Sequence, residues 1–229
     1  MTTRSSIWLA ALTAAVFTLA LTSSATAAPT DHLYGDLNGT NFDFLDMKET
    51  VQTAADDPHP LWDAPSLSGD NLLFAPSSFI ADSFNGPFFS DFDESHSTFN
   101  ATIMSTSVYD IENILLSEGG DITLTDLTAG SGTAQTQVNA FMSGTVQIVE
   151  SSNPGYVGAM ITFGGAGADY EVFFDLGNGV DNTSLKKTLQ PEGAFSWKGT
   201  VDIDVAALYP GATKVELQWN NVLQANSET

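Results

Sequence analysis

Residues 98–229 alternate between apolar and polar side chains over three long stretches. In the clearest stretch the odd positions are Phe195, Trp197, Gly199, Val201, Ile203 and Val205, and the even positions are Ser196, Lys198, Thr200, Asp202 and Asp204. Residues 138–148 and 215–225 repeat this pattern. A period of two is typical of a β-strand that buries one face. The pattern therefore predicts three half-buried strands, with Trp197 and Trp219 on their buried faces. Gly144 interrupts the second stretch, and a strand glycine of this kind predicts a bulge.

Shorter apolar runs predict further strands between these stretches. They cover residues 72–74, 98–105, 111–116, 121–127, 160–163 and 170–176. Glycine-rich turn signals separate them, at positions 118–120, 130–132, 153–155, 164–165 and 177–179. Short strands at near-regular spacing with glycine turns favour antiparallel architectures. We therefore expect an all-β fold, an antiparallel β-sandwich that is jelly-roll-like.

Residues 28–97 have a different texture from the rest of the chain. They are rich in Asp, Pro, Phe and Ser and show little periodicity, so we expect a loop-rich N-terminal third. One short helix is predicted over residues 42–55, because Met47, Lys48 and Glu49 favour helix over strand. This helix should end before Asp57-Pro58, since the residue that precedes a proline avoids the α region.

The first 27 residues have the composition of an export signal. Arg4 supplies a positive charge, residues 7–21 form an uncharged apolar stretch, and Ala25-Thr26-Ala27 is an A-x-A cleavage site. The apolar stretch is short for a membrane span, which needs roughly 20 residues. We therefore expect residues 1–27 to be a signal peptide and residues 28–229 to be a single secreted β-sandwich domain.

The charge balance excludes several kinds of partner. The chain of 229 residues has 28 acidic and 6 basic side chains, which gives a formal net charge of −22, and it has no cysteine. Binding to nucleic acid requires a basic surface, so we expect no nucleic-acid partner. Anionic membrane surfaces are disfavoured for the same reason, and we expect no membrane association after signal cleavage. The lack of cysteine excludes disulfides, thiol catalysis and thiolate zinc sites.

Four segments carry a resemblance to a known group of proteins. They are residues 68–79 (starting Ser68-Gly69-Asp70-Asn71-Leu72-Leu73-Phe74), 115–124, 130–138 and the closing Ala-Thr-Lys-Val-Glu-Leu strand. This layout resembles secreted bacterial proteins of unknown function of the PEP-CTERM-associated type. The resemblance implies export in bacteria with an exopolysaccharide-rich surface, and it implies no catalytic residues. The sequence ends at Ser227-Glu228-Thr229 without the sorting tail of that group, so we expect free release to the extracellular space.

Two groups of oxygen-bearing side chains are candidate metal ligands. They are Asp175, Asn178 and Asp181 in one expected loop, and Asp91, Asp93 and Glu94 in another. Calcium prefers carboxylate and amide oxygens, so either group suits that ion. The second group also suits an acid–base pair if it is buried. The alternative for both is an ordinary solvated loop, and calcium is the only cofactor that the sequence suggests.

Trp62 is the candidate ligand-binding residue. It lies in the segment His59-Pro60-Leu61-Trp62-Asp63, which we expect to be a loop, so its ring is expected to be more exposed than those of Trp197 and Trp219. Exposed aromatic rings stack on sugars in carbohydrate-binding sandwiches. The alternative is that Trp62 covers the core as a lid.

The sequence therefore favours three functions in a clear order. The first is a non-enzymatic extracellular structural or adhesive protein, because strong strand patterning accompanies export and no H-E-x-x-H, G-x-S-x-G or P-loop motif is present. The second is a carbohydrate-binding module supported by calcium, with extracellular polysaccharide or other matrix components as partners. The third is a hydrolase of extracellular polysaccharide. It would need histidines such as His32, His59 and His96 to converge with carboxylates.

Overall fold

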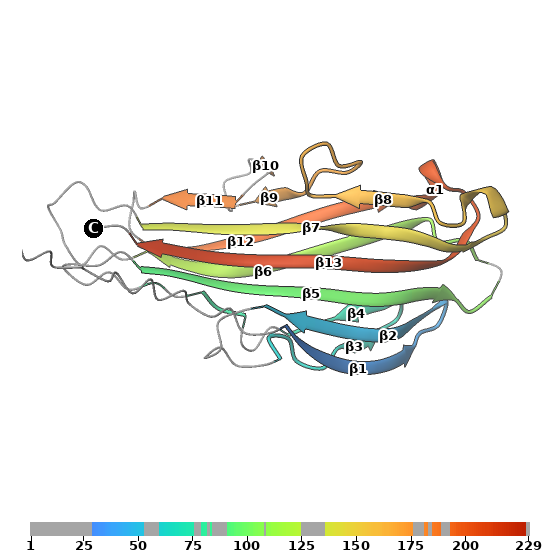
Figure 1. The fold of residues 1–229 in the computed structure, drawn as a ribbon, viewed down its shortest axis with the longest axis horizontal. Helices are drawn as coiled ribbons and strands as arrows, with labels where there is room; N and C mark the ends of the chain where they lie inside the picture. The colour runs from blue at the N-terminus through green and yellow to red at the C-terminus, as the bar shows by residue number, and fades with distance from the viewer. Residues whose placement is uncertain are drawn as a thin grey trace, which may run out of the picture.

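Two antiparallel β-sheets face each other across a shared apolar interior (Figure 1). The computed structural model describes residues 29–52, 60–75, 79–81, 83, 91–107, 109–124, 136–175, 181–182, 185–188 and 193–227. Every strand pair among these residues is antiparallel, so the predicted all-β sandwich is confirmed. The jelly-roll connectivity stays a prediction. The predicted signal peptide lies outside the described residues.

The large sheet is built around three long strands. Its order is β1 (Thr30–Asn38), β2 (Phe42–Val51), β5 (Asp91–Ser105), β13 (Ala212–Ser227), β7 (Thr136–Ser151) and β11 (Leu185–Thr188), and β8 (Met160–Phe163) also pairs with β7. The central strand β13 pairs with β5 on one side and with β7 on the other over nearly its whole length. These three strands form the rigid centre of the molecule.

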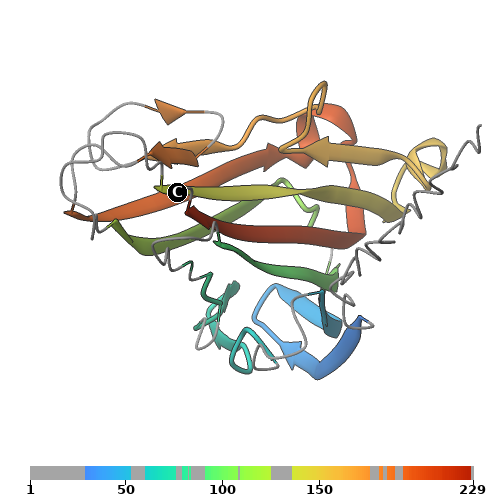
Figure 2. The same cartoon turned by 60° about the vertical axis from the view of Figure 1, so that its left-hand side comes forward.

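The small sheet packs against the large sheet, and a separate β-hairpin lies at one edge of the large sheet. Its order is β10 (Asp181–Asn182), β9 (Phe173–Asp175), β12 (Gly193–Asp204) and β6 (Asn113–Leu124). In Figure 1, β6 and β12 cross behind β7 and β13. The separate hairpin of β3 (Ser66–Ser68) and β4 (Asn71–Leu73) lies near β1 and β2 at one edge of the large sheet (Figure 2). A 3-10 turn η1 (Pro154–Tyr156) and a short helix α1 (Val205–Leu208) complete the described elements.

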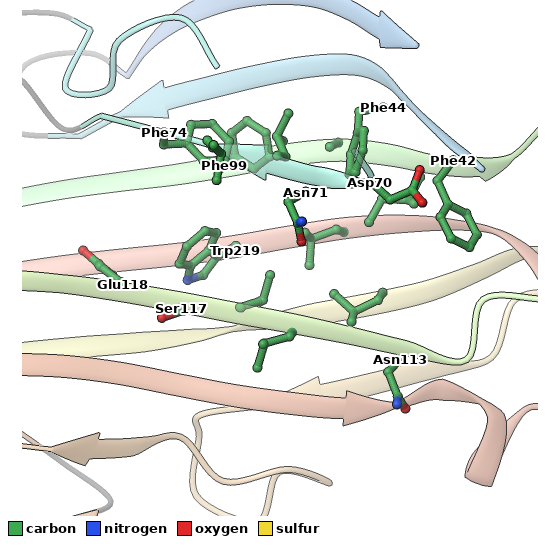
Figure 3. A pocket seen from close by; sticks show the side chains of 18 of the residues that line it. Phe42, Phe44, Asp70, Asn71, Phe74, Phe99, Asn113, Ser117, Glu118 and Trp219 are labelled. Atoms are coloured by element: carbon green, nitrogen blue, oxygen red, sulfur yellow. The ribbon is translucent and has the colours of Figure 1, made fainter. Parts of the chain in front are cut away.

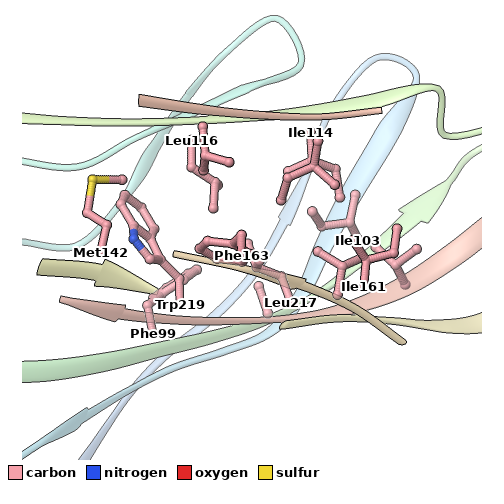
Figure 4. Close-up of a cluster of buried hydrophobic side chains, with 14 of the residues drawn as sticks. Phe99, Ile103, Ile114, Leu116, Met142, Ile161, Phe163, Leu217 and Trp219 are labelled. Carbon is pink, nitrogen blue, oxygen red and sulfur yellow. The ribbon is translucent and has the colours of Figure 1, made fainter. Parts of the chain in front are cut away.

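Side chains from both sheets interlock in the interior (Figure 4). Ile114 and Leu116 on β6 face the large sheet, where Ile161 and Phe163 on β8 are no more than 1% exposed. Both tryptophans that the alternation placed inside are buried, with 6% of Trp197 and 6% of Trp219 exposed. That part of the sequence-based prediction is confirmed.

Gly144 does not form the predicted bulge. It lies in regular register opposite Trp219 on β13 and Phe163 on β8. A Cβ atom on Gly144 would lie 2.5 Å from the Phe163 ring, and the same atom would also clash with the carbonyl oxygen of Gln218. The glycine therefore makes room for a large ring in a straight strand. The register of β7 shifts instead near its end, opposite the segment between Ala212 and Val215.

Strand β6 is continuous where the sequence predicted a turn at residues 118–120. Gly119 and Gly120 lie in register with Lys198 and Trp197 of β12. A Cβ on Gly120 would lie 3.0 Å from the Nε1 atom of Trp197. The two glycines thus serve close packing in mid-strand, and the turn prediction is wrong.

The helix predicted over residues 42–55 is also wrong, because residues 42–51 form strand β2. The buried apolar side chains Phe44, Met47 and Val51 are spaced three and four residues apart, as on a helix. This spacing arises because the register with β5 shifts between Leu45 and Lys48, where Asp46 has a φ of +52°. The bulge switches the face to which the later side chains point. The described part of residues 28–97 is accordingly more regular than expected.

The short helix that the structure does contain was predicted as strand end. Val205 closes the predicted stretch of alternation but is the first residue of α1. The Asp204 carboxylate accepts a hydrogen bond from the backbone N–H of Ala207 at 2.8 Å, as expected for an N-cap. Over the described residues, no helix has the length and apolar character needed to cross a membrane.

Candidate functional site

The outer face of the three long strands carries mostly uncharged polar side chains. On β5 these are His96, Thr98, Asn100 and Thr102, on β13 they are Gln218, Asn220 and Gln224, and on β7 they are Gln137, Asn139, Ser143, Thr145 and Gln147. We call this surface the amide face. The described charged groups on this face of the strands are Glu94 at one end and, toward the other end, Glu216 and Lys214, which pairs with Glu150 at 3.4 Å. In a chain of net charge −22, this composition marks a surface suited to contact with an uncharged partner.

Hydrogen bonds order one end of the amide face across all three strands. The Gln137 side-chain amide donates to Asn139 at 2.8 Å, and Asn139 donates to Gln224 at 3.4 Å. Gln224 donates to the Glu94 carboxylate at 2.7 Å. The donors all point the same way, from β7 through β13 to β5. Such a network fixes the side chains before a ligand arrives, which lowers the entropic cost of binding.

The middle of the amide face combines hydroxyls with one exposed ring. The Thr98 hydroxyl donates to the Asn220 amide oxygen at 2.8 Å, and Ser143 lies next to Asn220 in register. One row further along, Phe141 is 44% exposed and lies opposite Val222 on β13. An aromatic ring among hydroxyls and amides offers both stacking and hydrogen bonding to a sugar.

A cavity of about 500 Å³ opens between the two sheets and the β3–β4 hairpin (Figure 3). Its walls include six aromatic rings: Phe42, Phe44, Trp62, Phe74, Phe99 and Trp219. Leu73 on β4 and Leu115 on β6 also line it and are 49% and 67% exposed, so the mouth lies between these two strands. A volume of this size and an apolar lining are typical of small-molecule sites.

Glu118 is a buried carboxyl group in the wall of this cavity. Only 8% of its surface is exposed, and it makes no hydrogen bond or ion pair with the residues that the structure describes. Burial alone raises the pKa of the Glu118 carboxyl to about 8. At neutral pH the group is therefore mostly protonated, and it is then both a hydrogen-bond donor and an acceptor.

The indole of Trp219 is a second polar group without a partner in the same cavity. Its Nε1 atom is buried and has no hydrogen-bond partner among the described residues. Figure 3 shows Trp219, from β13, and Glu118, from β6, toward the same end of the cavity. Asp70 and Asn113 lie toward the other end. There Asp70 accepts hydrogen bonds from the backbone and side chain of Asn41, and the backbone bond holds the pKa of Asp70 below its usual range.

Trp62 is not exposed as predicted, since only 5% of its surface is accessible. Its ring stacks on Phe79 with centroids 5.2 Å apart and lies 6.3 Å from Trp219. Its indole donates to the Ser97 hydroxyl at 3.2 Å. Trp62 is thus a lid over the core, which was the alternative, and it reaches a ligand only through the cavity that it lines.

Ser97, which accepts the hydrogen bond from Trp62, also donates to a buried carboxylate, Glu49. Glu49 is 0% exposed, and its two oxygens lie 2.6 Å from the Tyr34 hydroxyl and 2.8 Å from the Ser97 hydroxyl. Burial, followed by the hydrogen bond to Glu49, raises the pKa of Tyr34 above its usual range. Because both oxygens are bonded within the protein, this group supports the fold and is not open to a ligand.

The structure places one predicted group of metal ligands on a strand and describes only part of the other group. Asp91, Asp93 and Glu94 lie on strand β5 and not in a loop. Neighbouring strand residues point to opposite faces, so Asp93 and Glu94 do not face a common ion. In the other group, Asp175 lies opposite Asp181 in the β9–β10 pair, and Asn178 is outside the described residues. Calcium at that hairpin stays a prediction.

The histidines do not meet in the described part of the chain. His32 is on edge strand β1, with its ring 4.8 Å from Tyr34, whereas His96 is on β5 at the amide face. His59 lies outside the described residues. No histidine lines the cavity, and among the residues described no three His, Asp or Glu side chains are placed to hold a metal ion.

No protein-family model, curated protein or solved structure matches the chain. The candidate sites therefore rest on the geometry of this structure.

Glu118 was not among the candidate residues predicted from the sequence, although a signal for it was present. The even positions Ile114, Leu116, Gly120 and Ile122 are apolar or glycine, and continuing their alternation through the two glycines places Glu118 on the inner face. The turn signal at Gly119-Gly120 concealed that continuity.

Proposed function

We propose that this protein is a secreted, non-enzymatic adhesive protein that binds neutral extracellular polysaccharide on the amide face. The observation that carries the proposal is the uncharged, hydrogen-bonding surface of β5, β13 and β7 in a strongly acidic chain. A neutral sugar polymer presents hydroxyl groups and no charge. It therefore pairs with amides and hydroxyls, and it is not repelled by the carboxylates elsewhere on the molecule.

The length of the surface supports a polymer as the partner. The central strands have 15 or 16 residues, and each strand residue advances the chain by about 3.3 Å. The amide face, which on β7 runs from Gln137 to Gln147, is therefore roughly 33 Å long, enough for several consecutive sugar rings. Export, as predicted from residues 1–27, would bring this face to extracellular polysaccharide.

Phe141 is the residue through which the proposal is tested. Its exposed ring is expected to stack on the apolar face of a sugar, as aromatic rings do in other carbohydrate sites. The chain offers a matched control, because Phe173 on β9 is also 44% exposed but lies on the outer face of the small sheet. Replacing either ring by alanine removes the same exposed apolar area.

The experiment measures retention of the purified protein by neutral polysaccharides, namely dextran, galactomannan and cellulose, with anionic alginate for comparison. We expect binding to at least one neutral polymer and none to alginate. Phe141→Ala should weaken that binding about tenfold, which corresponds to about 1.4 kcal/mol, and Phe173→Ala should leave it unchanged. Failure to bind any neutral polymer, or equal loss in both variants, would contradict the proposal.

A further inference from the structure

The cavity between the sheets is separate from the amide face. We propose that it takes an uncharged, elongated apolar molecule that carries a carbonyl or hydroxyl oxygen at one end. The apolar body of the ligand lies between the aromatic walls, and its oxygen lies at the end formed by Trp219 and Glu118. This site does not depend on polysaccharide binding.

The shape of the cavity favours an elongated ligand. Ile114 and Glu118 both line it from the inner face of β6 and are four positions apart, which corresponds to about 13 Å along the strand. Two exposed leucines that line the cavity, Leu73 and Leu115, come from different elements, β4 and β6, and present an apolar entrance. An apolar molecule can therefore enter from the side and lie along β6.

The unpartnered polar groups determine the chemistry of the ligand's polar end. The Trp219 indole is a donor only, so it requires an acceptor atom. A buried donor without a partner destabilises the protein, and a ligand oxygen would recover that free energy. The neighbouring Glu118 carboxyl, when protonated, is a second donor for the same end of the ligand. Two donors favour an oxygen acceptor over an ammonium group, which would itself need an acceptor.

Binding of this kind should depend on pH through Glu118. The other ionisable group in the cavity wall is Asp70, which is engaged by Asn41 toward the far end. Lys198 and Asp121 share a shallow hollow with Glu118 on the other side of β6. Neither contributes to the raised pKa of Glu118, whose cause is burial. Above pH 8 the ionised carboxylate no longer donates, and it repels an acceptor oxygen.

The experiment uses Prodan, a neutral fluorescent naphthalene with one ketone oxygen, as the probe. We expect it to bind the purified protein with a blue-shifted emission. The protonated fraction of a group with a pKa of about 8 falls from about 0.9 at pH 7 to about 0.1 at pH 9. The dissociation constant should therefore rise about tenfold between these two pH values. Circular dichroism at both pH values verifies that the protein remains folded.

Three variants separate the site from general effects of pH and folding. Glu118→Gln keeps a donor at every pH, so Prodan should bind it equally at pH 7 and pH 9. Trp219→Phe keeps a ring but removes the N–H, and it should weaken binding about tenfold at pH 7. Glu112→Gln, an exposed carboxylate that precedes β6, should retain the full pH dependence of the unaltered protein.

The possible outcomes decide the proposal. The expected pattern in the unaltered protein and the three variants supports it. The lack of Prodan binding to folded protein, or an affinity that does not change with pH, would overturn it. An affinity for Prodan that rises with pH would also overturn it. So would tighter binding of dodecyltrimethylammonium than of Prodan at both pH 7 and pH 9, because the site would then prefer a cation.

Discussion

The two outer faces of the sandwich differ in charge, although both are built from alternating strands. The amide face of the large sheet carries Thr, Asn, Gln and Ser at its centre. The outer face of the small sheet carries the exposed charged residues Asp121, Lys198, Asp202 and Asp204. Alternation alone therefore does not explain the amide face, because any polar residue satisfies a strand position that faces water. We propose that the acidic small sheet keeps the protein dispersed while the large sheet makes contact.

The first prediction tests whether both faces depend on one interior. Phe163→Ala should lower the free energy of unfolding by about 3–5 kcal/mol, because its buried ring fills the space above Gly144. Urea unfolding followed by circular dichroism and by tryptophan fluorescence measures this loss. Phe173→Ala, on the exposed face, should change stability by less than about 0.5 kcal/mol. Separate transitions for the two probes would show that the sheets unfold independently.

The second prediction concerns a carboxyl group in the interior, in contrast with those on the acidic face. The pKa of Glu118 in the folded protein is about 8, well above its ordinary value of 4.5. Its contribution to stability is therefore fully present below pH 4.5 and is lost as the pH rises to 8. The difference in the free energy of unfolding between Glu118→Gln and the unaltered protein should therefore change between pH 4.5 and pH 9. The change should favour Glu118→Gln at pH 9 by on the order of 4 kcal/mol.

Thermal or urea melts of both proteins across this pH range measure that difference. Asp202→Asn is the control, because its carboxylate is exposed on the small sheet and remains hydrated. A difference between Glu118→Gln and the unaltered protein that stays constant from pH 4.5 to pH 9 would contradict burial of an ionisable group at this position.

The third prediction adds a charge to the uncharged face. Asn220→Asp keeps the oxygen that accepts the Thr98 hydrogen bond but places a carboxylate at the centre of the amide face. It should weaken polysaccharide binding about tenfold, because the carboxylate must lose hydration on contact. Thr200→Asp places the same charge at the middle of β12 on the acidic face and should have no effect. Equal polysaccharide affinity of the two variants would contradict the proposal that binding requires an uncharged amide face.

The smallest expected effect is that of salt on stability. The acidic groups repel one another more strongly in the folded protein than in the expanded chain, so the melting temperature should rise with NaCl. The rise should level off above about 0.1 M, where the Debye length is about 10 Å.

CaCl₂ and MgCl₂ compared at equal ionic strength test the Asp175–Asp181 hairpin. A gain with calcium alone that Asp175→Asn abolishes would establish a site there.

The sequence predicted those parts of the fold in which alternation is uninterrupted. Strands β7, β12 and β13 have long regular patterns, and the burial of Trp197 and Trp219 follows directly from them. Strand β2 was missed because its bulge at Asp46 gives the buried apolar residues a helix-like spacing. A bulge is stabilised by pairing with β5, a distant segment, and local sequence does not reveal that contact.

The candidate sites were less predictable, for a physical reason. Trp62 looked like a loop residue, yet its burial depends on contacts with Phe79 and Ser97, which are distant in the sequence. The amide face appears only when β5, β13 and β7 are placed in register. Glu118 needed a continuous β6, which the packing of Trp197 against Gly120 makes possible. Each of these features arises from tertiary contact.

We propose that the amide face binds a neutral polymer without the help of charge. The most direct measurement compares the best-bound neutral polysaccharide with its carboxymethylated derivative over a range of NaCl concentrations. We expect the neutral polymer to bind with an affinity independent of salt, and the carboxymethylated polymer to bind more weakly at low salt and to recover as charges are screened. Tighter binding of the carboxymethylated polymer, or neutral binding that disappears with salt, would contradict the claim.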